Sequence, residues 1–180
     1  MWRGRRLVDI DGDRIRPTTD RVREAWMSAM GGRFDRLEVL DLFAGSGALG
    51  LECLSRGAAH VTFVDASPAS IDVLGANLDL LDVDSSRATL VTADALEWLG
   101  GDPVVEDGGE RPYRVDLALA DPPYDAGLAT ALVRRWEARP FAAELWVEHR
   151  SEHPVESPLV RRARTYGGTT ITTLTTPSDA

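Results

Sequence analysis

Between residues 38 and 149, short apolar runs alternate with segments of helical pattern, and this alternation constrains the fold more than any other feature. The apolar runs are EVLDLF (38–43), HVTFVD (60–65), ATLVT (88–92), VDLALAD (115–121) and AELWVEH (143–149). Between them the pattern predicts helices over residues 47–57, 67–81, 94–99 and 126–138. Near-continuous apolar strands joined by helices are typical of an α/β fold whose parallel sheet is covered on both faces.

The segments that flank this alternation add a helix, an arm and a loop. Val22, Trp26 and Met30 recur at four-residue spacing and predict a helix over residues 17–30. Residues 1–16 are rich in arginine and predict an extended basic arm. Residues 100–112 combine glycine, proline and acids, which indicates a mobile surface loop.

The C-terminal part predicts a β-hairpin. Two strand-like runs within residues 158–176 meet at Gly167 and Gly168, a turn signal. This hairpin should place one antiparallel strand at the edge of the sheet. We therefore expect a single domain over residues 1–180, with a mostly parallel seven-stranded sheet, helices on both faces and a C-terminal antiparallel hairpin.

Composition excludes several classes of site. The chain has 180 residues, 43% of them hydrophobic, which is enough for one ordinary core. Cys53 is the only cysteine, so no intrachain disulfide can form, and the three scattered histidines give no metal-site spacing. No apolar run reaches the length of a membrane span. These features predict a soluble, cytoplasmic protein without a metal, and we expect a monomer.

The charge is unevenly distributed. The net charge of −9 by itself argues against a polyanionic partner. Residues 1–36, however, hold nine arginines and six acids, a balance of +3, whereas the remainder holds eleven arginines and twenty-three acids, a balance of −12. Because salt screens charges beyond about 8 Å, a basic patch near the N-terminus can act despite the acidic remainder.

A glycine-rich turn follows the first apolar strand. The segment LDLFAGSGALGLE places Gly45, Gly47 and Gly50 in the pattern G-x-G-x-x-G between a strand and a helix. Glycines there allow a tight turn and a close approach of backbone to ligand. Asp65 ends the second strand twenty residues after Gly45, where a carboxylate can accept hydrogen bonds from ribose hydroxyls. The combination predicts a cofactor that contains a nucleoside.

Two further acids indicate which cofactor. Asp41 precedes the first glycine by four residues, where a carboxylate would repel a pyrophosphate and attract an ammonium or a sulfonium. S-adenosylmethionine carries both cations. Asp94 ends the third strand and could accept a hydrogen bond from the adenine amino group. It could equally cap the following helix, and the two roles are compatible.

The fourth strand ends on the residues DPPY (121–124). At this end of such a sheet Asp121 would lie beside the methyl group, and its carboxylate and the Pro122 carbonyl could accept the two N–H bonds of a planar amine. That geometry would expose the nitrogen lone pair, while Tyr124 offers a face for base stacking. The alternative is a plain strand stop, since two prolines remove two backbone donors. Cys53 falls on the first helix after the turn, so methylation of a ring carbon through a thiol adduct is not expected.

Several motifs resemble one known family. RGRRL, RPTTDRVREAW, LDLFAGSGALGLECLSRGA, VD and ADPPY follow one another in the order found in the RsmD-type small-subunit ribosomal RNA guanine-N2 methyltransferases. The resemblance covers about residues 2–150. It implies a Rossmann-like class I methyltransferase fold with S-adenosylmethionine as donor. It also implies methylation of the N2 amine of one guanine in 16S rRNA, as naked RNA or within the small ribosomal subunit.

The resemblance also implies roles for individual residues. The candidate cofactor-binding residues are Thr19 (or its neighbour Thr18), Asp41, Phe43, Ala44, Gly45, Gly47, Asp65, Ala66, Asp94 and Ala95. The candidates for holding the guanine are Asp121, Pro122, Pro123 and Tyr124. The candidates for RNA binding are Arg3, Arg5, Arg6, Arg14, Arg16, Arg21 and Arg23, because guanidinium groups pair bidentately with phosphate. The alternative for these arginines is a solvated basic arm.

Three other functions fit parts of the pattern. A DNA adenine-N6 methyltransferase would use the same DPPY residues, but such enzymes usually carry a separate target-recognition domain. A non-catalytic assembly factor that binds S-adenosylmethionine and RNA would not need Asp121. Protein glutamine methyltransferases usually have asparagine at that position. The motif alone does not distinguish guanine from adenine, so the choice of guanine depends on the resemblance.

Overall fold

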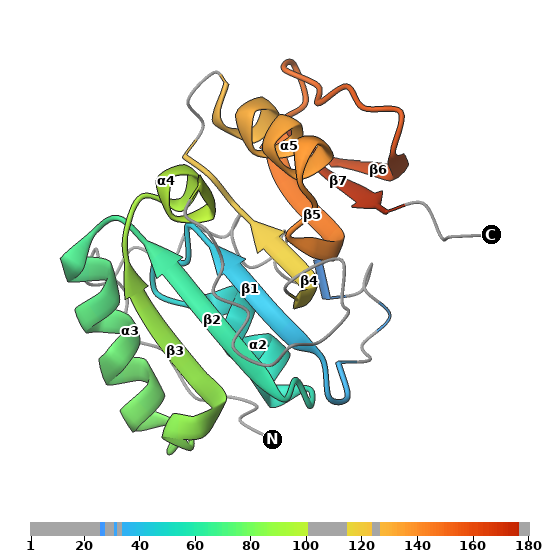
Figure 1. Ribbon diagram of the computed structural model, residues 1–180. Coiled ribbons are helices and arrows are strands. Elements are labelled where there is room, and N and C mark those ends of the chain that lie inside the picture. Colours follow the sequence, from blue (N-terminus) through green and yellow to red (C-terminus); the bar gives the residue numbers. More distant parts are fainter. Residues whose placement is uncertain (1–25, 28–30, 32–33, 101–114, 124–126, 177–180) are drawn as a thin grey trace.

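A seven-stranded sheet forms the centre of the molecule. The computed structural model describes residues 26–27, 31, 34–100, 115–123 and 127–176 (Figure 1). The strands lie in the order β3-β2-β1-β4-β5-β7-β6. Their bounds are β1 Glu38–Leu42, β2 His60–Asp65, β3 Ala88–Thr92, β4 Val115–Ala120, β5 Ala142–Arg150, β6 Val160–Tyr166 and β7 Thr169–Thr175. Strands β1 to β5 pair in parallel, so the predicted α/β architecture is confirmed.

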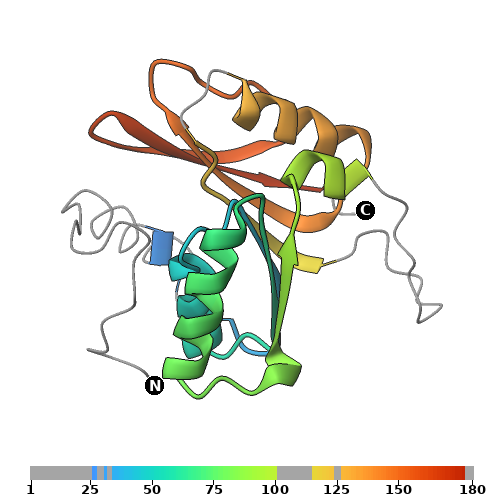
Figure 2. The ribbon, with the colours of Figure 1, turned by 90° about the vertical axis from the view of Figure 1, so that its left-hand side faces the viewer.

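Helices cover both faces of this sheet. Their bounds are α2 Ala48–Ser55, α3 Pro68–Leu80, α4 Ala95–Gly100 and α5 Leu128–Ala138, with a short 3₁₀ turn at Ser85–Arg87. Figure 2 shows α2 and α3 on one side of the strands and α4 and α5 on the other. Helix α3 begins where Ser67 accepts a hydrogen bond from the Ser70 N–H (3.2 Å) and Pro68 occupies the first turn.

Two apolar clusters join the helices to the sheet. One contains α2 and α3 residues together with Trp26, Met27 and Phe34. The other contains α4 and α5 residues such as Leu99 and Trp136. Strands β1, β2, β4 and β5 are largely buried on both faces because each cluster takes alternate side chains from them, as the near-continuous apolar runs predict, whereas the outer strand β3 is largely exposed.

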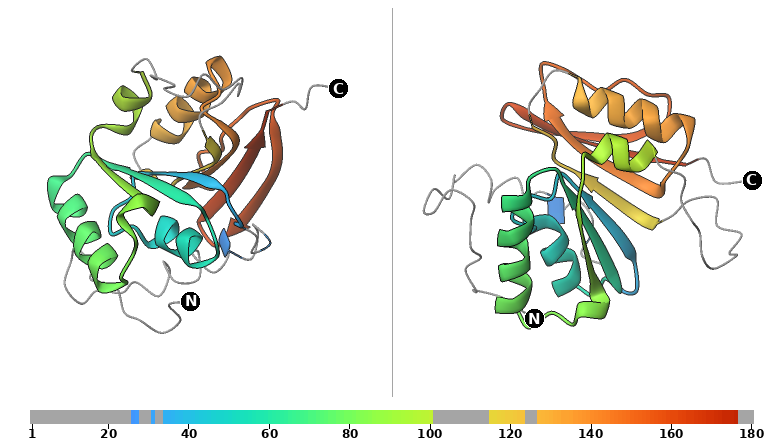
Figure 3. Two further views of the ribbon diagram at one scale, coloured as in Figure 1. Left: turned by 60° about the horizontal axis from the view of Figure 1, so that its bottom comes forward. Right: turned by 60° about the vertical axis from the view of Figure 1, so that its left-hand side comes forward.

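The C-terminal hairpin is confirmed, but its placement differs from the prediction. Strand β7 lies between β5 and β6 and pairs antiparallel with both, so the antiparallel strand is internal and β6 forms the edge. The burial of the two strands explains the order. β7 is buried over Thr169–Leu174, whereas β6 carries exposed arginines that tolerate an edge. Figure 3 shows this hairpin far from α3, at the other side of the molecule.

Some predictions concern parts of the chain outside the described residues. These are the basic arm, nearly all of the helix predicted over 17–30, and the loop predicted over 100–112 apart from Gly100. Within the described ranges, no helix combines the length and the apolar character needed to cross a bilayer.

Candidate active site

The glycine turn connects β1 to α2 at the carboxyl end of the sheet. Gly45 and Gly47 have φ values of 55° and 81°, in the left-handed region that favours glycine. A Cβ on Gly47 would lie 2.1 Å from Leu74 Cδ1, and one on Gly50 would lie 2.3 Å from Phe63 Cε1. A Cβ on Gly45 would meet nothing within 4 Å. Gly47 therefore allows the start of α2 to pack against α3, Gly50 allows α2 to approach β1 and β2, and Gly45 borders open space.

Hydrogen bonds hold this turn against the next strand. The Gly45 N–H donates to Asp65 Oδ2 (2.8 Å), and the Ser67 N–H donates to Asp65 Oδ1 (2.9 Å). Asn77, buried on α3, donates its Nδ2 to the Ser46 carbonyl (3.1 Å). The Asp65 carboxylate is thus oriented by backbone on both oxygens, and each oxygen has a further lone pair for a hydroxyl donor.

Asp41 lies beneath the turn and not on its surface. Its side chain is 2% exposed, and its Oδ2 accepts the Gly50 N–H (2.9 Å). Burial raises the pKa of Asp41 to about 8; the Gly50 hydrogen bond opposes this rise, and the charges of Asp121 and Asp65 add to it. The carboxyl therefore holds a proton near neutral pH while the site is open, and its contact with a cation stays a prediction.

Asp94 caps a helix at the end of β3. Its Oδ1 accepts the N–H groups of Leu96 (2.9 Å) and Glu97 (3.0 Å). The predicted capping role is confirmed, whereas the hydrogen bond to an adenine stays a prediction. Next to it, Ala95 is buried in the apolar cluster that also contains α5 residues, and Ala66, just after β2, is exposed.

Asp121 directly follows β4 on the same edge of the sheet. Pro122 is buried and Pro123 exposed. The pKa of Asp121 is raised to about 7, first because the surrounding protein displaces water and then because the Glu148 charge lies beside it. Asp121 also keeps exposed surface, so water screens both effects in the open site and they strengthen when a ligand fills it.

Glu148 is a residue of this site that the sequence analysis missed. It is 5% exposed on β5, and the pairing of Ala120 with Val147 puts it next to Asp121. Its Oε2 accepts the Trp26 indole N–H (3.1 Å). A signal was present, because a glutamate near the end of the apolar run AELWVEH is unexpected in a buried strand. Asn77 carried a similar signal within the apolar stripe of α3.

These acids share one face and one end of the sheet. Asp65, Asp121 and Glu148 stand at the carboxyl ends of neighbouring strands, with Asp41 on β1 between the first two. Alternation along each strand directs all four side chains to the α2 face. Such a row suits a ligand that carries positive charge beside a ribose. In the described part of the chain, no group of three or more His, Cys, Asp or Glu side chains could hold a metal ion.

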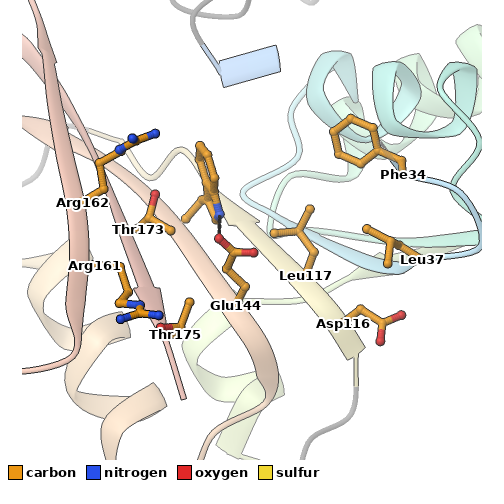
Figure 4. A pocket seen from close by; sticks show the side chains of 10 residues that line it. Phe34, Leu37, Asp116, Leu117, Glu144, Arg161, Arg162, Thr173 and Thr175 are labelled. Carbon is orange, nitrogen blue, oxygen red and sulfur yellow. Dashed lines mark hydrogen bonds between the residues drawn. The ribbon is translucent and has the colours of Figure 1, made fainter. Parts of the chain in front are cut away.

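A cavity of about 520 Å³ opens at the opposite end of the strands and contains none of the predicted site residues. In Figure 4, Arg161, Arg162, Thr173 and Thr175 line one side and Phe34 and Leu37 the other. Asp116, Leu117, Glu144 and Trp146 complete the lining. The Trp146 indole N–H donates to Glu144 Oε1 (2.7 Å). This cavity therefore does not coincide with the predicted site.

Several predicted residues lie outside the described ranges. They are Thr18, Thr19, Tyr124 and the seven arginines of the N-terminal segment. The structure thus brings together the glycine turn, Asp41, Asp65, Asp94 and Asp121, and the placement of the others stays a prediction.

Comparison with known proteins gives consistent matches. Residues 1–175 match the family described as Conserved hypothetical protein 95. A protein of Haemophilus influenzae, ribosomal RNA small subunit methyltransferase D, is 32% identical over 88% of this chain and 80% of its own length. The Escherichia coli protein of the same name is 34% identical over 85% of this chain and 73% of its own. The solved structure of yhhF from Escherichia coli superposes with a TM-score of 0.76 at 30% identity, covering 97% of this chain and 93% of that one.

Proposed function

This chain belongs to the Conserved hypothetical protein 95 family of RsmD-type methyltransferases, and we propose that it methylates the N2 amine of one guanine in 16S rRNA. It is an rRNA methyltransferase that uses S-adenosylmethionine. The observation that carries the proposal is the placement of Asp121, which directly follows β4, two strands from Asp65 and beside the glycine turn. A substrate of this kind implies a cytoplasmic protein.

The cofactor would lie along the carboxyl end of β1, β2 and β3. The described residues fit this cofactor, because Gly45 leaves open space next to the Asp65 carboxylate, which its backbone N–H holds in place. When bound, S-adenosylmethionine supplies an electrophilic methyl group on a sulfonium. Asp65 would accept hydrogen bonds from the ribose hydroxyls, and Asp94 would accept one from the adenine amine. Backbone and small side chains would complete the contact, from Phe43, Ala44, Gly47, Ala66 and Ala95.

The base would lie beside Asp121. Its carboxylate and the Pro122 carbonyl would each accept one N–H of the N2 amine, turning the nitrogen lone pair toward the methyl group. The lone pair would attack the methyl group that bound S-adenosylmethionine supplies, with the thioether as leaving group. Asp121 would accept the N–H proton that the amine loses and pass it to water. Tyr124 would stack on the base, which must first leave its helix at a cost of a few kcal/mol.

The N-terminal arginines would supply the phosphate contacts. A protein that neutralises phosphates releases counterions, so its affinity for RNA falls as salt rises. Replacing Arg3, Arg5 and Arg6 together by alanine should weaken RNA binding and flatten the plot of log affinity against log salt. An unchanged slope in a filter-binding titration would show that these arginines do not touch the RNA.

Transfer of a labelled methyl group tests the proposal directly. Small ribosomal subunits, naked 16S rRNA and DNA are offered separately, and the labelled nucleoside is identified after digestion. We expect N2-methylguanosine from one of the RNA substrates. Label in N6-methyladenine of DNA would favour the adenine alternative. Binding of cofactor and RNA without any transfer would favour an assembly factor.

A further inference from the structure

Glu148 lies where it can influence the reacting group without touching the base. From the contacts around it we infer that Glu148 is a positioning residue that acts on methyl transfer through Asp121. The inference rests on the proposed function, because it concerns the carboxyl that receives the amine. Asp121, in contrast, would itself contact the substrate.

The register of two strands brings the residues together. β4 and β5 are parallel, and Ala120 pairs with Val147, so the next positions, Asp121 and Glu148, are neighbours across the ladder. Side chains at paired positions point to the same face of a sheet. Glu148 is 5% exposed while Asp121 is open to solvent, so the pair joins a buried carboxylate to an accessible one.

Surrounding side chains hold the Glu148 carboxylate in one orientation. The Trp26 indole N–H donates to its Oε2 (3.1 Å), and Trp26 is 1% exposed. The ring of Trp26 lies 6.1 Å from that of Trp146, two residues before Glu148 on the same face. Ile171 of β7 pairs with Glu148 on the other side and is buried. The charge of Glu148 therefore stays near Asp121.

Among the described residues, the acids nearest Asp121 come from three other strands. Glu148 lies beside Asp121 on β5, and its charge raises the pKa of Asp121. Asp41 on β1 is protonated near neutral pH and adds no charge there, and Asp65 lies beyond it on β2. Helix α2 contributes the buried thiol of Cys53 next to Asp41, and β7 contributes only uncharged Ile171. A neighbouring carboxylate opposes ionisation of Asp121 and raises its pKa. Asp121 thereby becomes a better acceptor for the proton that the amine loses.

The test removes the charge and keeps the hydrogen bond. Glu148→Gln can still accept the Trp26 N–H, but it no longer opposes the ionisation of Asp121. We expect the acid limb of the pH profile of kcat/KM to move to lower pH. Each half-unit fall in the Asp121 pKa from about 7 raises the ionised fraction at pH 6 about two- to threefold. A purely structural role would lower the rate without moving the limb.

The chain offers a matched control on the same strand. Glu144 also lies on the α2 face of β5 and accepts a tryptophan indole N–H, but at the far end from Asp121. Glu144→Gln should leave the acid limb where it is. Superimposed wild-type and Glu148→Gln profiles, with both proteins active, would overturn the inference and leave the proposed function intact.

A second variant keeps the inference testable if Glu148→Gln does not fold. If thermal unfolding shows that Glu148→Gln does not fold, Glu148→Asp keeps the charge but withdraws it by one methylene. A lower kcat at unchanged KM for RNA would then support the inference, and wild-type values for both would refute it. Absence of methyl transfer by the wild-type protein on every substrate would instead contradict the proposed function itself.

Discussion

Each end of β5 holds a glutamate that accepts a tryptophan indole N–H, but the charges around the two glutamates differ in sign. At the start of the strand Glu144 accepts the Trp146 indole N–H beside a cavity that Arg161 and Arg162 also line. Near its end Glu148 accepts the Trp26 indole N–H beside Asp121. Unlike charges at the first end can compensate one another. Like charges at the second oppose one another, and the groups with a raised pKa, Asp41 and Asp121, lie toward the end that holds the predicted site.

Removing Asp121 should have the largest effect of any single change. Asp121→Ala deletes the acceptor for the amine, and we expect methyl transfer to fall by roughly 10²–10⁴-fold, as for other positioned catalytic groups. Calorimetry should show nearly unchanged binding of S-adenosylmethionine. Asp116→Ala is the control at the other end of β4, where Asp116 accepts the Glu38 N–H (2.8 Å). Full activity of Asp121→Ala would show that the carboxyl end of the sheet, where Asp121 lies, has no special part in methyl transfer.

The buried Asp41 should make stability depend on pH. Its pKa is about 8 in the folded protein and near 3.8 when unfolded, so the unfolded state releases the proton first as pH rises. The contribution of this proton to the stability of the folded state is fully present below about pH 3.8. It decreases as the pH rises and is lost by about pH 8. Within that window the loss is roughly 1.4 kcal/mol per pH unit for a fully protonated folded carboxyl.

Asp41→Asn tests this dependence while keeping an acceptor for the Gly50 N–H. Urea unfolding at several pH values should show the free energy of unfolding of the wild type falling relative to the variant as pH rises. Parallel curves for the two proteins would show that Asp41 ionises as readily in the folded state as in the unfolded one.

Two substitutions in the glycine turn should distinguish a glycine that is needed for packing from one that is needed for cofactor binding. Gly47→Ala brings a Cβ to 2.1 Å from Leu74 Cδ1 at a φ of 81°, so we expect about 1–3 kcal/mol of lost stability. Gly45→Ala enters open space at a φ of 55° and should cost about 1–2 kcal/mol, from the backbone alone. Its larger effect should be on cofactor affinity, measured by calorimetry. A Gly45→Ala protein with wild-type affinity would place the cofactor elsewhere.

The cavity at the other end should give the smallest effects. Arg161→Ala and Arg162→Ala alter exposed side chains far from Asp121, so methyl transfer should stay within about twofold of wild type, as for most surface substitutions. Initial rates on small subunits and on naked RNA provide the measurement. A large loss confined to one of these substrates would assign the cavity to substrate binding.

Local patterns predicted most of the sheet and the turn. The apolar runs agree with β1 to β5 within about one residue at each end, and Ser67 with Pro68 marked the start of α3. The position of β7 between β5 and β6 was not predicted, because a hairpin signal identifies two neighbouring strands without saying which one joins the sheet. The burial of β7 and the exposed arginines of β6 decide that.

The amino-acid sequence by itself determined the parallel α/β fold, the glycine turn, Asp65 at the end of β2 and Asp121 at the end of β4, since each depends on residues close in the chain. Only the tertiary structure decided the environment of those groups. The contact between Trp26 and Glu148 spans 122 residues. The pKa of Asp41 and that of Asp121 are raised first by burial in the packed sheet and then by the charges of acids on other strands. Charge and burial act through space, so their effects on this site follow from the packing of the sheet and not from any one segment.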